Sequence, residues 1–180
     1  MFNKKRIVGA LTCAVLLAAV ISAPAGAAIN LDITAGTLNF DGGAPTIGNF
    51  SGVTLNGTPQ LTSLTVDPFT VVDATGSGSG WNVLLTVPNL TDGSGDTILA
   101  SNISMTAPVV TAAATSSMTG VVGNASTGNF NTGETIVTAQ LTDGEGTYLV
   151  APRILKLTIP VTTIAGTYSS AATIATVSGP

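Results

Sequence analysis

The chain has 180 residues, a formal net charge of −4 and only 8% charged residues. It contains no histidine and a single cysteine, Cys13. These counts exclude imidazole- and thiolate-based metal sites and His- or Cys-dependent catalysis beyond the first residues of the chain. Five Lys and Arg residues are also too few to neutralise a nucleic acid backbone.

The first 27 residues have the pattern of a secretory signal peptide. The cationic segment Lys4-Lys5-Arg6 precedes the apolar stretch Ile7–Ile21, Pro24 then breaks the helix, and Ala25-Gly26-Ala27 offers a cleavage site. The rival interpretation is a membrane anchor, but fifteen apolar residues are fewer than the roughly 20 that span a bilayer. We therefore expect a secreted protein with no membrane segment after cleavage. Its nine carboxylates and two cations give a net charge of −7.

Residues 28–60 are rich in turns and are predicted to form N-terminal strands or an extended arm. Ile29, Leu31 and Ile33 alternate with polar residues, the period of a strand with one apolar face. Two interpretations stay open at this point. The segment is either an ordinary first strand paired within its own sheet or a free strand donated to another subunit.

Residues 61–180 predict an all-β fold, a single antiparallel β-sandwich of Greek-key or jelly-roll type. Short runs rich in Val, Ile, Thr and Leu alternate with turn signals, which is the pattern of such domains. Nothing marks a second domain, so residues 28–180 are expected to form one. We expect strands at 61–66, 69–73, 81–87, 97–105, 135–141, 146–150, 153–159 and 166–177. Residues 109–117 are Ala-rich and weakly favour a helix, although their Val and Thr content opposes it.

Trp81 begins a strand in which Val83, Leu85 and Val87 share its face. That apolar face favours a buried indole acting as a core anchor. A ligand-facing indole, stacking on a sugar ring, would instead have to be exposed.

Three other segments resemble chemical sites only weakly. Gly76–Gly80 leads into a strand, whereas a phosphate-binding loop leads into a helix N-terminus. Asp92, Ser94 and Asp96 have the spacing of calcium ligands, but the following glycine and distal glutamate are missing, so a solvated turn is favoured. The pair Asp143 and Glu145 lacks an apolar pocket that would separate two pKa values. We expect no enzyme activity and no cofactor.

Two stretches carry a resemblance to a known family. In the first, a strand and the turn Asp73-Ala74-Thr75-Gly76 lead through the glycine-rich run into Trp81-Asn82-Val83. In the second, Gly144-Glu145-Gly146-Thr147-Tyr148 precedes the closing strands at the end of the chain. These stretches resemble the WxL domain of bacterial cell-surface proteins, in which similar turns lead into Trp-x-Leu motifs. Here Val83 replaces the leucine of the first motif, and the second motif, at Ala175-Thr176-Val177, has lost its tryptophan.

The resemblance implies a secreted β-sandwich held non-covalently at the bacterial cell wall, with peptidoglycan or other wall-associated surface proteins as partners. It also implies that Trp81, Asn82 and Val83 form the wall-binding motif. The alternative is a self-assembling subunit of a pilus, fibre or surface coat. Such a subunit would polymerise by donating the strand that carries Ile29, Leu31 and Ile33.

Overall fold

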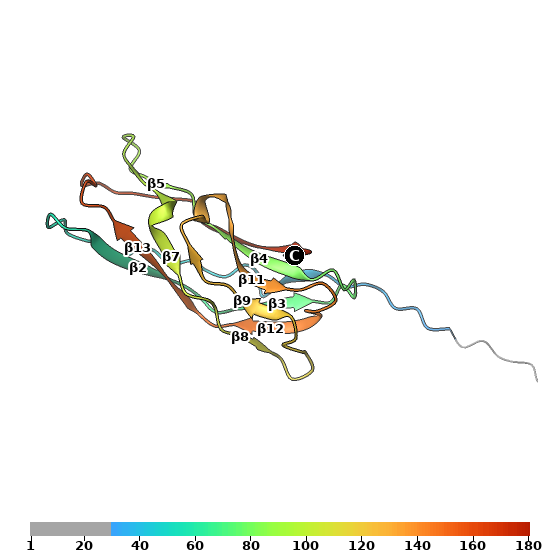
Figure 1. Ribbon diagram of the computed structural model, residues 1–180. Coiled ribbons are helices and arrows are strands. Elements are labelled where there is room, and N and C mark those ends of the chain that lie inside the picture. Colours follow the sequence, from blue (N-terminus) through green and yellow to red (C-terminus); the bar gives the residue numbers. More distant parts are fainter. Residues whose placement is uncertain (1–29) are drawn as a thin grey trace, which may run out of the picture. The chain divides into compact units, whose positions relative to one another are not determined.

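The computed structural model describes residues 30–180, and residues 34–180 form one compact unit (Figure 1). The predicted signal peptide and Ile29 lie outside the described residues. The unit consists of short antiparallel strands with two 3-10 turns, which confirms the all-β class and is consistent with a β-sandwich. No helix in the described part of the chain is long and apolar enough to cross a membrane.

Two of the hydrogen-bonded sheets are continuous with each other, because strands of one run directly into strands of the other. The first has the order β1-β3-β12-β8, and the second has the order β10-β7-β13-β2. Their strands are β1 (Leu38–Asp41), β3 (Phe69–Asp73), β12 (Gly146–Val150), β8 (Val110–Ala112), β10 (Ser126–Thr127), β7 (Ile103–Met105), β13 (Arg153–Ile159) and β2 (Gln60–Val66).

The two sheets are halves of one long, bent sheet. Val66 lies opposite Arg153 and Phe69 lies opposite Val150, so the register between β2–β3 and β12–β13 continues unshifted through the bend. The register is also unshifted where β7 pairs with β13 and β8 pairs with β12. Each of the three bent strands carries a proline there, at positions 68, 108 and 152. Proline removes a ladder hydrogen bond and is tolerated where the strand bends.

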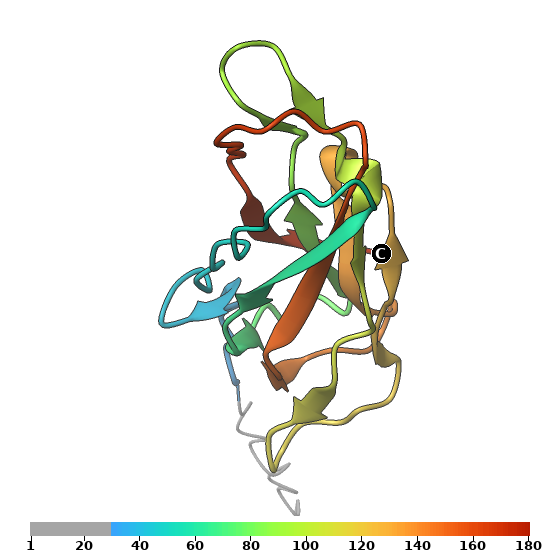
Figure 2. The same cartoon turned by 90° about the vertical axis from the view of Figure 1, so that its left-hand side faces the viewer.

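A four-stranded sheet with the order β14-β4-β11-β9 forms the other layer. Its strands are β14 (Thr173–Ser178), β4 (Trp81–Thr86), β11 (Glu134–Ala139) and β9 (Val121–Gly123). A small hairpin of β5 (Leu90–Thr91) and β6 (Thr97–Ile98) projects beyond the layers (Figures 1 and 2). The 3-10 turns are η1 (Ala100–Asn102) and η2 (Phe130–Thr132).

The core lies between the bent sheet and the four-stranded sheet. Leu155 and Leu157 of β13 face it from one side, and Val83 and Leu85 of β4 face it from the other. The period-two pattern at 81–87 therefore predicted the buried face of β4 correctly. Each large apolar side chain buried in this way contributes about 1.5–3 kcal/mol to stability.

Three local predictions were wrong. Residues 97–105 form two strands interrupted by η1 rather than one strand. The weak helix at 109–117 is absent: β8 occupies 110–112 because Val110 and Ala112 pack on the core as part of a sheet. The predicted last strand, 166–177, begins only at Thr173, since residues 160–172 form the connection from β13 to β14.

Candidate functional site

Trp81 is the centre of the region that carries the family resemblance. Its side chain has no exposed surface, and its indole N–H donates to the backbone carbonyl of Gly144 at 2.8 Å. The Tyr148 ring packs against it with ring centres 5.5 Å apart. The expectation of a buried indole is confirmed, and a sugar ring has no access to it.

Two glycines allow close backbone packing here, Gly144 against the indole and Gly80 against the backbone of residues 139–140. A Cβ on Gly144 would lie 2.7 Å from Trp81 Nε1, and its φ of +88° suits glycine. A Cβ on Gly80 would lie 2.7 Å from the carbonyl oxygen of Gln140, again at positive φ. Gly80 and Gly144 are thus required for packing. We call Trp81, Tyr148, Gly80 and Gly144 the Trp81 cluster.

Tyr148 fixes the other side of the cluster. Its side chain is buried, and its hydroxyl lies 2.8 Å from the carbonyl oxygen of Ser117 and 3.1 Å from that of Glu145. The hydroxyl has one proton, so these two acceptors share it. Burial raises the pKa of the Tyr148 phenol above its usual value of 10.0, and the nearby carboxylates of Glu145, Asp143 and Asp73 raise it further.

The glycine-rich loop is held by its own side chains rather than shaped for a phosphate. The buried carboxylate of Asp73 accepts from the N–H and the hydroxyl of Thr75, at 2.9 and 2.7 Å. Thr75 then accepts from the N–H of Ser77, and Ser77 accepts from that of Ser79. The loop ends directly in β4, a strand, so no helix N-terminus is present to bind an anion.

The two motif segments lie side by side in the four-stranded sheet. Thr176 pairs with Val83 and Val177 pairs with Asn82, so the degenerate second motif on β14 is the direct neighbour of the first motif on β4. Val83 points into the core, whereas Asn82 lies on the outer face, where its amide donates to the carbonyl of Gly179 at 2.8 Å. Ala175 is exposed on the same face.

We define the outer face of this sheet by the residues that alternate with the buried ones along its strands. None of them is charged, and threonine and asparagine supply most of the polar groups. The residues are Thr173, Ala175 and Val177 of β14; Asn82, Leu84 and Thr86 of β4; Thr135 and Thr138 of β11; Val122 of β9; and Asn124, which follows β9. The side-chain amide of Asn124 donates a hydrogen bond to the hydroxyl of Thr138, on the neighbouring strand, at 2.9 Å.

The calcium candidates form the tip of the β5–β6 hairpin. Asp92 Oδ1 accepts from the backbone N–H groups of Ser94, Gly95 and Asp96 at 2.8–3.1 Å, as in a self-contained turn. Within residues 30–180, no group of three or more His, Cys, Asp or Glu side chains is placed to hold a metal ion.

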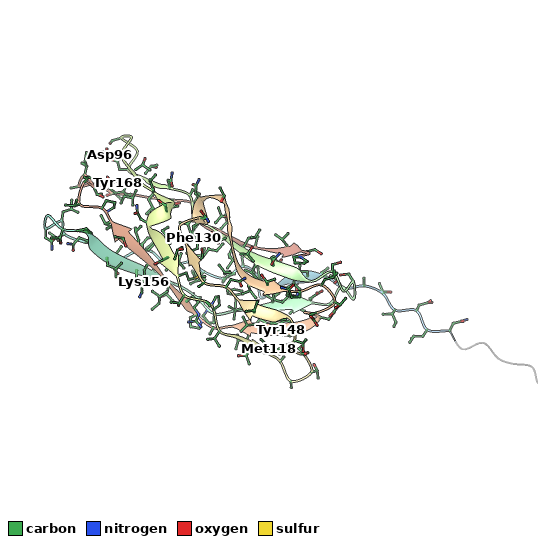
Figure 3. The ribbon with its side chains drawn as sticks, in the orientation of Figure 1. Asp96, Met118, Phe130, Tyr148, Lys156 and Tyr168 are labelled. Atoms are coloured by element: carbon green, nitrogen blue, oxygen red, sulfur yellow. The ribbon has the colours of Figure 1, made fainter. Side chains whose placement is uncertain are left out.

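The remaining candidates are distributed over the surface. Asp143 and Glu145 lie in the turn next to the Trp81 cluster. Lys156, which no candidate site includes, projects from the outer side of β13 (Figure 3). Leu31 and Ile33 precede the compact unit and are 81% and 86% exposed. Sequence reasoning missed the role of Gly144 as the acceptor for Trp81. The only signal for it was the resemblance-bearing segment Gly144-Glu145-Gly146-Thr147-Tyr148.

Comparisons with protein-family models, with curated proteins and with solved structures found no match for this chain.

Proposed function

We propose that this protein is a secreted, non-catalytic surface protein, held non-covalently at the bacterial cell wall through a WxL-like domain. The observation that carries the proposal is the Trp81 cluster. The two stretches that resemble the family lie 63 residues apart, and they meet in one hydrogen bond and one aromatic pair. The strand with the second motif pairs beside the first. A resemblance spread over distant segments gains weight when those segments form one packed unit.

The finer form of the proposed fold is a jelly roll. β2–β3 pairs with β12–β13 in the bent sheet, and β4 pairs with β11 in the other layer. Successive long strands therefore alternate between layers in nested antiparallel pairs, which is the order of a rolled-up hairpin. In this proposal β1 and β14 are edge strands added to that core.

Wall contact is assigned to the outer face rather than to the indole of Trp81. The indole is fully buried, so its role is to hold β4 against the 143–146 turn. The outer face carries Asn82 and Val177 from the two motifs and has no charged side chain. Its hydroxyl and amide groups suit the neutral polar groups of a glycan. An uncharged face also brings no carboxylate of this acidic protein against the acidic peptides of peptidoglycan.

The test is co-sedimentation of residues 28–180 with purified peptidoglycan. We expect Val122→Glu/Val177→Glu to abolish binding, since these exposed positions lie on the outer face. The matched control, Leu149→Glu/Ile154→Glu, adds the same charge to the outside of the bent sheet and should bind as the parent does. Equal loss in both variants, or no binding by the parent, would refute the assignment.

A further inference from the structure

The end of the sandwich opposite the Trp81 cluster contains an apolar groove. Its cavity of about 460 Å³ is lined by Leu157 and Ile159 of β13 and by Leu90 and Ile98 of the small hairpin. A neighbouring cavity of about 560 Å³ also contacts Leu90 and shares Phe50 and Tyr168 with the first. The four-stranded sheet does not extend over this end, so residues 50–55 and the connection 160–172 form the cover. We call the first of these cavities the end groove.

The edge of β2 becomes uncovered beside this groove. The segment before it follows β2 through bonds from Gly48 N–H to the Thr65 carbonyl at 2.9 Å and from Ser51 N–H to the Ser63 carbonyl at 3.3 Å. No later backbone bond joins residues 52–59 to β2 in the described structure. Leu61, the next residue whose backbone faces this edge, has no backbone partner there in the described structure. An uncovered edge is a template for an added strand.

A segment with matching chemistry precedes the compact unit in the sequence. Leu31 and Ile33 alternate with Asn30, Asp32 and Thr34, so in an extended conformation both apolar side chains project to one side. Both are more than four-fifths exposed. The segment joins the compact unit where Gly36 N–H donates to the Ala74 carbonyl at 2.8 Å, directly after β3. We call residues 30–35 the arm.

The arm is too short to reach the groove of its own molecule. Thr62, in the groove wall, lies twelve residues before Ala74, or roughly 40 Å along β2 and β3 at about 3.3 Å per residue. Leu31 lies five residues before Gly36 and extends at most about 18 Å from it. Tyr148, in the Trp81 cluster, and Tyr168, in the groove wall, mark the two opposite ends (Figure 3).

We propose that the end groove binds the arm of a second copy of this chain, with Leu31 and Ile33 in its apolar interior and the arm backbone along the open edge of β2. Because the arm's attachment point at Gly36 and the end groove lie at opposite ends of the compact unit, the contact is head-to-tail. Such contacts do not close on themselves unless their rotation generates a ring, so they give chains of subunits. This inference goes beyond wall attachment and does not depend on it.

Disulfide trapping tests the contact directly, since Cys13 is the only natural cysteine and precedes residue 28. Residues 28–180 with Ile33→Cys/Ile164→Cys carry one thiol on the arm and one at the groove wall, where Ile164 is 58% exposed. Mild oxidation should give a ladder of cross-linked multimers. The control Ile33→Cys/Val122→Cys places the second thiol on the outer face and should give at least tenfold less product. Equal ladders, or none, would overturn the proposal.

Light scattering on the unoxidised protein gives a second readout. The parent should form concentration-dependent multimers. Leu31→Ser/Ile33→Ser should weaken association by roughly 100-fold, since the two apolar side chains that become buried in the contact are lost. These positions precede the compact unit, so the variant should remain folded. A parent that remains a single copy at every concentration contradicts the proposal. The arm variant should leave wall binding unchanged. Light scattering therefore tests the subunit contact and co-sedimentation tests wall binding independently of each other.

Discussion

Replacement of Gly144 by alanine should strongly destabilise the fold. The new methyl group would overlap Trp81 Nε1 at 2.7 Å and would force an L-residue to φ +88°. The left-handed conformation costs roughly 1–2 kcal/mol, the crowding about 1–3 kcal/mol, and the lost indole hydrogen bond about 0.5–1.5 kcal/mol. The expected loss in the free energy of unfolding is therefore about 3–6 kcal/mol. That is a large part of the roughly 5–15 kcal/mol of a typical domain.

Gly93→Ala is the matched control for this variant. Gly93 has φ +79°, but a Cβ there would meet nothing within 4 Å, so the control carries only the conformational cost. Urea unfolding followed by the fluorescence of Trp81, the single tryptophan, measures both variants. We expect Gly144→Ala to unfold about 1–2 M urea earlier than Gly93→Ala, taking a slope of about 2 kcal/mol per M. Equal midpoints would refute the packing argument.

Three further predictions concern the tyrosine and the hairpin tip. Tyr148→Phe removes the hydroxyl shared by two carbonyls and should lower the free energy of unfolding by about 1–3 kcal/mol, because both acceptors lose their donor. An unchanged midpoint in urea unfolding would contradict this prediction. The pKa of Tyr148 is raised on folding, so its neutral form stabilises the fold below pH 10 and this contribution is lost as pH rises through the raised value. The free energy of unfolding measured from pH 8 to 11.5 should fall at the alkaline end, less steeply in Tyr148→Phe than in the parent. Millimolar calcium should leave the melting temperature unchanged in both the parent and Asp92→Asn, because backbone N–H groups already occupy Asp92 Oδ1. A calcium-dependent rise in the melting temperature of the parent alone would show a calcium site at the hairpin tip.

The sequence predicted the fold class and the buried faces where a local pattern determines them. The alternation of Trp81, Val83 and Leu85 requires only that one face of a strand be buried, and these side chains have no exposed surface. The bend of the long sheet was not predicted. It depends on prolines at 68, 108 and 152 coming into line across three strands, and that alignment exists only once the strands pair.

The contacts of the candidate site could be predicted only in part for the same reason. That Trp81 would be buried followed from its neighbours in the chain, but its acceptor, the Gly144 carbonyl, lies 63 residues away. The positive φ of Gly144 is set by the turn between β11 and β12, not by a short-range pattern. The end groove could not be predicted from the sequence either, since it forms where the connection 160–172 rather than a strand covers β13.

The central claim is attachment to the cell wall through the uncharged outer face. Co-sedimentation of residues 28–180 with purified peptidoglycan, over a range of protein concentrations, tests it most directly. The account predicts saturable binding that Val122→Glu/Val177→Glu abolishes and Leu149→Glu/Ile154→Glu leaves intact. A protein that stays in the supernatant at every concentration, or that binds equally in all three forms, would contradict the account.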